Sequence, residues 1–321
     1  MSLEKTWRWF GPHDPVKLAD ARQAGASGII TALHQIPTGE VWQKEAILER
    51  KGIVEKAGMT WSVAESINVH EDVKLRTGEY KQYLENYKQS IRNMGECGID
   101  TVCYNFMPLL DATRTNFSYA LPNGAKTLRF DRITLIAFDL FILKRTNAEA
   151  DYSEEEQSLA LDFLNKLDDQ EKDQLISTLV AGFPNVGQNY SLENLRDSLQ
   201  KYIQTGRDGI RQNLAEFIGE VTPVAEEAGV YLTIHPDDPP YSILGLPRVV
   251  STSDDLGFLL GAYESDHNGI CFCAGSLGVR PDNDVPGMVK QFSDRINFIH
   301  LRNIKREENG AFIESDHLDG V

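Results

Sequence analysis

The sequence predicts an α/β fold, a (β/α)8 barrel of the TIM-barrel type, with its eighth β/α unit missing from the sequence given. Short apolar runs alternate with longer amphipathic stretches, which is the pattern of repeated βα units. The length of 321 residues suits one large barrel better than one ordinary domain. No Gly-rich phosphate-binding loop follows the first apolar run, which disfavours a doubly wound nucleotide-binding sheet, although an open sheet remains the alternative.

Seven apolar runs have the length and composition of buried parallel strands. A closed parallel barrel needs eight βα units, and the sequence reaches Val321 without an eighth such run. The strand count therefore predicts a barrel with one unit absent from these residues. From the N-terminus onward, the seven runs cover residues 6–10, 28–34, 60–66, 100–106, 230–235, 269–274 and 296–301.

Amphipathic stretches between these runs predict helices, three of which are well defined at residues 41–58, 79–98 and 213–229. The last two end in Gly98 and Gly229, a residue type that readily adopts the left-handed conformation that closes a helix. Each helix is followed by the next apolar run, as expected at the αβ junctions of a barrel.

The connection between the fourth and fifth strands is unusually long and covers residues 107–190. Its apolar stripes predict a helical insertion within a single barrel domain that spans residues 1–321. An insertion after a strand lies at the C-terminal face of a barrel, where lids and specificity elements occur. A contact between subunits is an equally good interpretation of this segment.

The charge balance limits the possible partners. The chain has 32 Lys and Arg against 48 Asp and Glu, a net charge of −16, so no basic stripe is expected for nucleic acid. No apolar run is long enough to cross a membrane, and the N-terminus has no signal-like core. A small anionic molecule remains a suitable partner, because a local arginine or metal ion outweighs distant, screened charge. A homodimer is the default assembly.

Four cysteines, at positions 97, 103, 271 and 273, do not suggest a disulfide framework. Three of them lie in strand-like apolar runs, and a chain of this size needs no covalent staples. We therefore expect a reducing, cytoplasmic location.

Two of the late strands end in residues that can bind a metal ion. In the fifth strand, Leu232 and Ile234 share the face suited to the helices, so His235 is expected to point into the barrel at its C-terminal end. The same alternation turns Cys273, at the end of the sixth strand, inward.

The seventh strand ends in His300, but both of its faces are largely apolar, so alternation leaves the direction of this side chain open. Its position at the strand end favours the same rim. Imidazole and thiolate together favour ions such as Zn²⁺, Fe²⁺ or Mn²⁺ over Mg²⁺ or Ca²⁺. Taken singly, a strand-end histidine is more often a hydrogen-bonded structural residue, and a buried cysteine is usually packing.

Further polar residues follow the strand ends. Arg302 could hold a substrate carboxylate through a bidentate contact, whereas Arg302 and Glu65 are equally consistent with ordinary ion pairs at the rim. Asp237 and Asp238 are either hydrogen-bonding partners of His235 or turn formers before the prolines. The remaining side chains expected at the same mouth are His34 and Asn105.

Five segments, spread from the first strand to the end of the chain, together resemble the mannonate dehydratase family of hexuronate breakdown. The segments are TWRWFG at 6–11, CYNFMP at 103–108, IHPDDPP at 234–240, CAGSLGVRPDND at 273–284 and IHLRN at 299–303. The resemblance implies a (β/α)8 barrel that removes water from D-mannonate to give 2-keto-3-deoxy-D-gluconate, with Mn²⁺ or Fe²⁺ as its one divalent metal. It also implies that His235, Cys273 and His300 are metal ligands.

The family also has an Arg-Pro-Asp-His-Gly segment near its C-terminus, which supplies an aspartate ligand and a catalytic histidine. No such segment occurs in these 321 residues. The fourth ligand and the main acid–base histidine are therefore expected beyond Val321.

Dehydration requires a base for the C2 proton and an acid for the leaving C3 hydroxyl. We expect Arg302 and Glu65 to assist the chemistry, and His34, Asn105 and Arg302 to bind substrate. Two other functions remain open from the sequence. One is a metal-dependent sugar or sugar-acid isomerase on the same barrel, and the other is a non-catalytic sugar-acid-binding protein.

Overall fold

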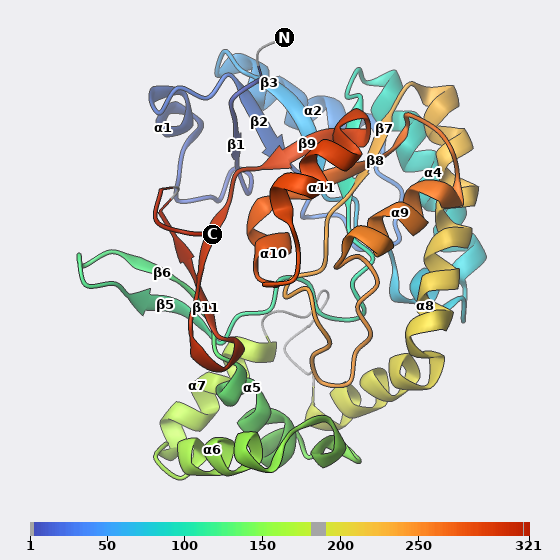
Figure 1. The fold of residues 1–321 in the computed structure, drawn as a ribbon. Coiled ribbons are helices and arrows are strands. Elements are labelled where there is room, and N and C mark those ends of the chain that lie inside the picture. The colour runs from blue at the N-terminus through green and yellow to red at the C-terminus, as the bar shows by residue number, and fades with distance from the viewer. Residues whose placement is uncertain (1–2, 181–190, 317) are drawn as a thin grey trace.

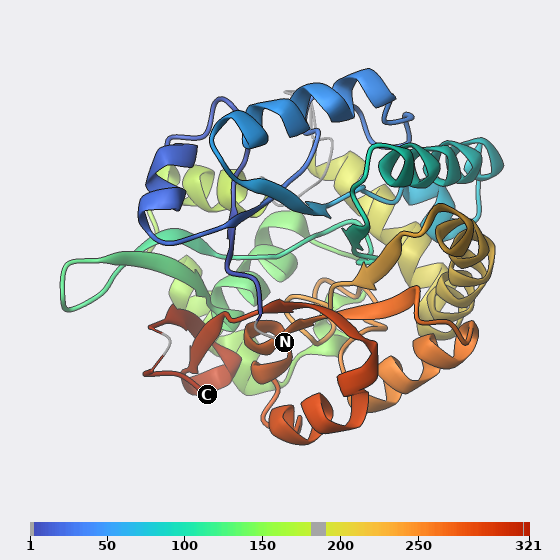
Figure 2. The same cartoon turned by 90° about the horizontal axis from the view of Figure 1, so that it is seen from above.

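A curled, seven-stranded parallel sheet forms the centre of the molecule (Figures 1 and 2). A computed structural model of the chain describes residues 3–180, 191–316 and 318–321. The strand order β1-β2-β3-β4-β7-β8-β9 follows the chain, and every neighbouring pair is parallel. These strands are β1 (Thr6–Arg8), β2 (Gly28–Thr31), β3 (Thr60–Glu65), β4 (Thr101–Tyr104), β7 (Tyr231–Ile234), β8 (Asn268–Cys273) and β9 (Ile296–His300).

All seven predicted strands are therefore present, with ends that differ from the predicted ones by up to three residues; β8 begins one residue earlier than predicted, and no strand extends further than predicted at its C-terminal end. Helices connect them and lie along the outer side of the sheet (Figure 2). The helices are α1 (Leu18–Gln23), α2 (Lys44–Lys56), α3 (Glu71–Leu75), α4 (Tyr80–Glu96), α8 (Leu192–Ala228), α9 (Ser253–Ala262), α10 (Ala274–Gly278) and α11 (Val285–Phe292), with a short turn of helix η3 (Ser293–Arg295) before β9.

The helix predicted at 213–229 is the C-terminal part of α8, which begins much earlier, at Leu192. The first part of α8 buries Leu195, Leu199 and Tyr202, an i, i+4, i+7 pattern that gives it its own apolar face. Gly206 interrupts the helix with φ 68° and ψ 175°, values that glycine adopts without a steric penalty.

Two apolar clusters fill the two sides of the sheet. The larger one lies between strands and outer helices and includes Leu232, Ile234, Ile270 and Phe272. The smaller takes one residue from each of five strands. It consists of Ile30, Val63, Cys103, Cys271 and Phe298. The alternation expected for the fifth and sixth strands is thus present, and the enclosed side of the sheet is packed like the interior of a barrel.

A second, antiparallel sheet, here called the accessory sheet, has the order β10-β11-β6-β5. This sheet was not predicted from the sequence, because its strands are short and pair across long separations, as Phe312 does with Phe130. One pair follows β4 and the other follows β9. The strands are β5 (Asn116–Ala120), β6 (Lys126–Phe130), β10 (Asn303–Arg306) and β11 (Phe312–Ser315), with η4 (Glu308–Gly310) between the last two.

The connection after β4 contains helices, as expected, in addition to β5 and β6. These helices form the lower part of the molecule in Figure 1, away from the sheet. Residues 181–190 of the predicted insertion lie outside the described residues. The helical elements are α5 (Arg132–Ala137), a π-helical segment η1 (Phe138–Leu143), η2 (Ala148–Asp151), α6 (Glu154–Leu164) and α7 (Asp169–Val180).

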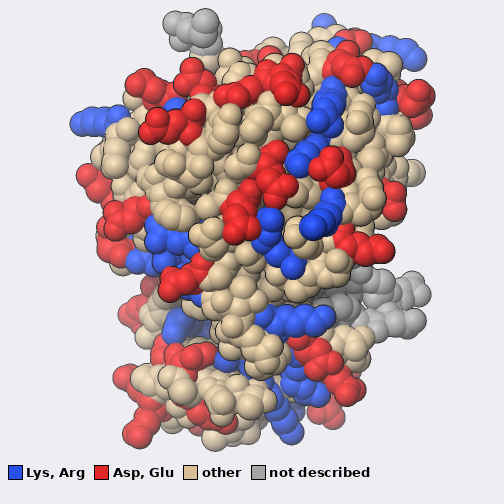
Figure 3. Space-filling model, turned by 90° about the vertical axis from the view of Figure 1, so that its right-hand side faces the viewer, with Lys and Arg blue, Asp and Glu red and all other residues tan. Residues whose placement is uncertain are grey.

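Acidic and basic side chains are interspersed on the face that carries α4 and α8 (Figure 3). Ion pairs hold α8 to its neighbours: Lys88 of α4 lies 3.4 Å from Glu220, and Arg76, just after α3, lies 2.9 Å from Glu216 and 3.1 Å from Glu220. Within the described residues, no helix combines the length and the apolar character needed to cross a membrane.

The sheet is open between β1 and β9. In the part of the chain that the structure describes, β1 pairs with β2 alone and β9 with β8 alone. A cavity of about 1360 Å³, here called the seam cavity, lies between these two edges. Its lining includes Trp7 and Arg8 of β1 together with Phe298 and His300 of β9.

Candidate metal centre

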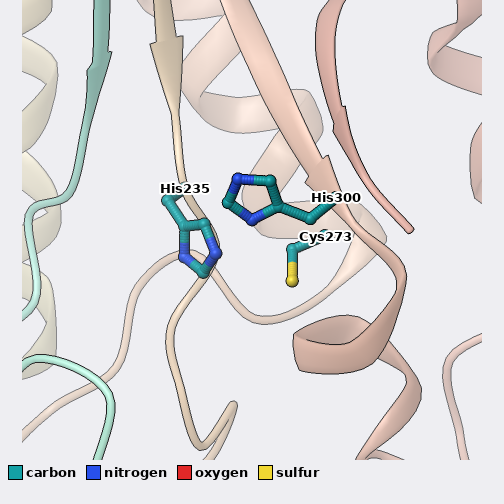
Figure 4. A group of neighbouring side chains, drawn as sticks. All are labelled: His235, Cys273 and His300. Atoms are coloured by element: carbon teal, nitrogen blue, oxygen red, sulfur yellow. The ribbon is translucent and has the colours of Figure 1, made fainter. Parts of the chain in front are cut away.

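The side chains of His235, Cys273 and His300 meet at the C-terminal end of the sheet (Figure 4). One ligand atom from each lies within 4.8 Å of the others. Among the described residues, this is the one group of three His, Cys, Asp or Glu side chains arranged so that they could hold an ion. Three successive strands, β7, β8 and β9, deliver them.

Strand register explains why these three residues meet. Cys273 and His300 are the last residues of β8 and β9 and lie directly opposite each other. His235 follows β7, and its backbone N–H donates to the carbonyl oxygen of Tyr104 at 2.7 Å, which extends the parallel ladder by one residue. Phe298 belongs to the enclosed apolar cluster. His300 lies two residues further along the same strand, so its side chain points to the same side of the sheet.

The imidazole of His235 is oriented by its own chain. Its Nδ1 lies 2.7 Å from the carbonyl oxygen of Pro236, and a carbonyl oxygen only accepts, so Nδ1 carries the proton. This leaves Nε2 free to face Cys273 (Figure 4).

The imidazole of His300 uses the opposite nitrogen. Its Nε2 lies 3.1 Å from Oε2 of Glu65, at the end of β3. Nη1 of Arg8 lies 3.0 Å from the same carboxylate oxygen. Nδ1 of His300 is left to face Cys273 and His235, and the centroids of the two imidazoles are 5.0 Å apart. A carboxylate on the outer nitrogen of a metal-binding histidine is a common arrangement that fixes the ring and its tautomer.

The thiol of Cys273 caps the start of α10. Its Sγ accepts a hydrogen bond from the backbone N–H of Ser276 at 3.4 Å. The side chain is fully buried, and burial alone would raise its pKa. Arg302 and His235 outweigh burial, and the pKa of Cys273 lies well below its ordinary value.

The pKa values of the two histidines are raised, whereas that of Cys273 is lowered. Burial would lower both pKa values, but Cys273 raises the pKa of His235 to about 9. Cys273 and Glu65 together raise the pKa of His300 to about 10. A metal ion that binds these side chains must therefore compete with the protons that the raised pKa values favour on the two imidazoles.

The donor set fits a transition metal ion. Two imidazole nitrogens and a thiolate suit Mn²⁺, Fe²⁺ or Zn²⁺ and do not suit Mg²⁺ or Ca²⁺, which prefer oxygen ligands. Three protein ligands leave further coordination positions for substrate or for another residue, as in catalytic sites.

Arg302 lies beside the centre, and its guanidinium contacts protein groups. Nη1 donates to Oδ2 of Asp238 at 2.7 Å, and Nε lies 3.3 Å from Oε2 of Glu314. Asp238 also accepts two hydrogen bonds from Arg114, both 2.9 Å long. Although burial would raise it, the pKa of Asp238 lies far below its usual range because of Arg114 and Arg302.

His34 and Asn105 follow β2 and β4, and no hydrogen bond between described residues joins either of them to the three candidate ligands. His34 lines a recess of about 230 Å³ whose wall also includes Ser66 and His70. Partial desolvation, Arg8 and Arg50 lower the pKa of His34 to about 4. Asn105 donates to Oδ2 of Asp111 at 3.2 Å.

Three residues of this region were not singled out from the sequence: Arg8, Arg114 and Glu314. Arg8 could have been found, because it is the last residue of β1 and lies between Trp7 and Trp9, which point to the opposite side of the extended chain. Arg114 and Glu314 belong to the loop before β5 and to β11, and no local pattern connects them to Asp238, which is 124 residues from Arg114.

Comparison with known proteins identifies what the chain is similar to. The sequence model of the family described as D-mannonate dehydratase (UxuA) matches residues 3–321. The mannonate dehydratase of Saccharophagus degradans is 52% identical over 318 residues, which are 99% of this chain and 80% of that protein. That of a Marinomonas species is 53% identical over 319 residues, 99% of this chain and 82% of that protein. The crystal structure of mannonate dehydratase from Streptococcus suis serotype 2 superimposes with a TM-score of 0.76 at 35% identity, covering 99% of this chain and 78% of that one.

Proposed function

Because the chain belongs to the D-mannonate dehydratase family, we propose that His235, Cys273 and His300 hold the divalent ion on which the reaction of this enzyme depends. The enzyme removes water from D-mannonate and yields 2-keto-3-deoxy-D-gluconate in hexuronate catabolism. The single observation that carries the site assignment is the convergence of two imidazole nitrogens and one thiolate within 4.8 Å. The proposed ion is Mn²⁺ or Fe²⁺: the imidazole nitrogens suit Fe²⁺, and the remaining coordination positions can take the oxygen ligands that Mn²⁺ prefers.

When bound, such an ion supplies Lewis acidity for the negative charge that develops on substrate oxygens. The reaction breaks the C2–H and C3–O bonds. A base takes the C2 proton, the C3 hydroxyl leaves as water after it is protonated, and the resulting enol becomes the 2-keto product.

The residues around the centre have separable roles in this proposal. Glu65 holds His300 through Nε2, and the Pro236 carbonyl holds His235 through Nδ1, so both rings present a fixed nitrogen to the ion. His34, uncharged at neutral pH, and Asn105 bind the hydroxyl groups of the substrate. Glu65 and Arg302 both contact protein groups, which favours the proposal that they assist the reaction by holding other residues in place.

We further propose that an eighth β/α unit, outside these 321 residues, closes the sheet between β9 and β1. Both edges are unpaired within the described residues, and His300, Glu65 and Arg302 all line the seam cavity. A segment in that position would come beside the metal centre, where it would supply the fourth ligand and the acid–base histidine. The chain spans 80–82% of the length of the two relatives, which leaves them enough additional sequence for such a unit.

The assembly and location are also proposals. A cytoplasmic location is supported by four cysteines that are all buried and unpaired, as expected in a reducing compartment. A homodimer rests on the general frequency of twofold assemblies. The insertion at 107–190 is proposed to act as a lid over a single barrel domain, because it follows the C-terminal end of β4.

His300→Ala tests the metal assignment. In protein that also carries the proposed eighth unit, the variant should lose bound metal and dehydration of D-mannonate together, measured by elemental analysis and by a semicarbazide or thiobarbiturate assay for the 2-keto-3-deoxy product. An isomerase would give no such product. His267→Ala is the matched control, because His267 stacks on Tyr231 at 4.5 Å and contacts none of the proposed ligands. Full metal occupancy in His300→Ala would refute its role as a ligand.

A further inference from the structure

Four buried or half-buried charged side chains, here called the charged quartet, join the accessory sheet to the metal centre. Arg114 donates to both oxygens of Asp238 at 2.9 Å and to Oε1 of Glu314 at 2.8 Å. Arg302 donates to Asp238 at 2.7 Å and lies 3.3 Å from Glu314. Two guanidinium groups thus alternate with two carboxylates, and the quartet has no net charge.

The quartet is largely removed from water. The side chains of Asp238 and Arg114 are 0% and 2% exposed, and those of Glu314 and Arg302 are 17% and 25% exposed. Buried charges are tolerated when each is paired and hydrogen-bonded, and the loss of one partner leaves the others uncompensated. Each of the four charges therefore needs the others close by, and this requirement fixes the positions of the four side chains.

The quartet is connected to the chain just after each of the three proposed ligands, twice through its own members and once through a contact. Asp238 comes three residues after His235, and Arg302 comes two residues after His300. Nη2 of Arg302 lies 3.3 Å from Oγ of Ser276, whose backbone N–H donates to Sγ of Cys273. One connected set of charges thus fixes the chain after β7, β8 and β9 relative to one another.

Glu314 brings the accessory sheet into this arrangement. It lies on β11, which pairs with β10 on one side and with β6 on the other. Its backbone carbonyl accepts a hydrogen bond from Oγ1 of Thr127 on β6 at 3.0 Å. The carboxylate is therefore held by a sheet whose strands come from two distant parts of the chain.

We propose that Glu314 is a positioning residue, through which the accessory sheet holds Arg302, Arg114 and Asp238 and so sets the geometry of the metal ligands. This inference rests on the proposed metal centre. It assigns Arg302 a structural partner on each side, rather than a substrate carboxylate, and it gives the accessory sheet a function in the reaction.

The test measures metal binding in the absence of substrate, with Co²⁺ as the probe. Glu314→Gln removes the charge and keeps the shape, and it should weaken Co²⁺ binding about 10-fold, the lower end of the effect expected when a supporting partner of a metal ligand is lost. The thiolate-to-cobalt charge-transfer absorption should shift, because the ligands move relative to one another. Glu314→Asp, which keeps the charge, should recover part of the affinity.

Glu307→Gln is the matched control. Glu307 accepts a hydrogen bond from Nε of Arg129 at 2.8 Å and so joins β6 to the β10–β11 connection, without touching the quartet. It should leave Co²⁺ affinity and spectrum unchanged, while thermal melts of the metal-free proteins show that both variants fold. Unchanged affinity in Glu314→Gln, or an equal loss in both variants, would overturn the inference. Turnover of D-mannonate by protein that carries the proposed eighth unit, with Glu314 unchanged, tests the proposed function separately.

Discussion

The pKa values of His34, His235 and His300 differ because different groups surround the three imidazole rings. His235 and His300 each have one nitrogen occupied by an acceptor, the Pro236 carbonyl and the Glu65 carboxylate, and each presents the other nitrogen to Cys273. No ion pair joins His34 to a carboxylate among the described residues, and partial burial and the charges of Arg8 and Arg50 lower its pKa. The first two are thus suited to bind a cation, and the third is kept neutral for hydrogen bonding to an uncharged hydroxyl.

The pKa of Glu65 favours a supporting role over acid–base catalysis. Burial would raise it, but His300 and Arg8 lower it to about 2, so this carboxylate holds no proton to donate at neutral pH. We predict that Glu65→Gln weakens metal binding by about 10-fold or more, because a neutral amide holds the His300 ring less firmly. Metal titration checks this result, with Ser62→Ala on the same strand as control. Intact metal affinity with abolished turnover would instead favour a direct catalytic role.

His34 gives a prediction about pH. Because its pKa is lowered from 6.5 to about 4 in the folded protein, the unfolded chain takes up this proton first as the pH falls. This group should therefore reduce stability progressively from about pH 6.5 down to about pH 4. His34→Gln should remove that part of the pH dependence, measured as the difference between urea unfolding of the two proteins. An NMR titration midpoint for His34 near 6.5 would contradict the prediction.

Side-chain direction could be predicted from the sequence only where alternation was unambiguous. His235 and Cys273 follow strands with a clear apolar face, and their positions could be inferred. The direction of His300 could not, because Phe298 and Ile299 are both apolar, and only packing shows that Phe298 belongs to the enclosed cluster. The partners of Arg302 could not be predicted either, since only the folded chain brings Glu314 and Asp238 together.

At the level of elements, the parallel strands and their helices were predictable because each carries its own pattern. The accessory strands were not, since they are short and residues such as Asn116 to Ala120 are mostly exposed. They exist because two distant hairpins complete each other's hydrogen bonding, as at Phe312 and Phe130, which stack with centroids 5.3 Å apart. Such pairing depends on long-range contacts that no local window contains.

The contact between α4 and α8 depends on a glycine. A Cβ at Gly95 would lie 2.3 Å from the backbone oxygen of Ala228, which is too close for any packing. We predict that Gly95→Ala destabilises the protein by about 1–3 kcal/mol, the usual cost of overpacking. Gly219→Ala in α8, where a Cβ meets nothing within 4 Å, should instead stabilise by about 0.5–1 kcal/mol. Urea denaturation measures both, and equal effects would show that helix propensity rather than close approach governs Gly95.

For the whole molecule, the opening between β1 and β9 matters because residues of the metal centre and its supporting charges lie along it. The two edge strands of the parallel sheet, β1 and β9, carry Arg8 and His300, and these two residues contact the same Glu65 carboxylate. Closing the seam would therefore bury the link between the metal centre and its supporting charges. It would also satisfy the backbone groups along both edges, which otherwise present a template for unwanted pairing.

Trp7 reports on this closure. It lines the seam cavity and is 43% exposed, whereas Trp9, Trp42 and Trp61 are all 5% exposed or less. Iodide should therefore quench mainly Trp7 in the 321-residue chain. Adding the residues of the Streptococcus suis enzyme that lie outside its match to this chain should protect Trp7 from iodide, shift its emission to shorter wavelength and raise the melting temperature if, as proposed, they fill the seam cavity. A Trp7→Phe variant assigns the signal. If the added segment folds and Trp7 remains as accessible as before, the proposal that an eighth unit occupies the space between β9 and β1 is wrong.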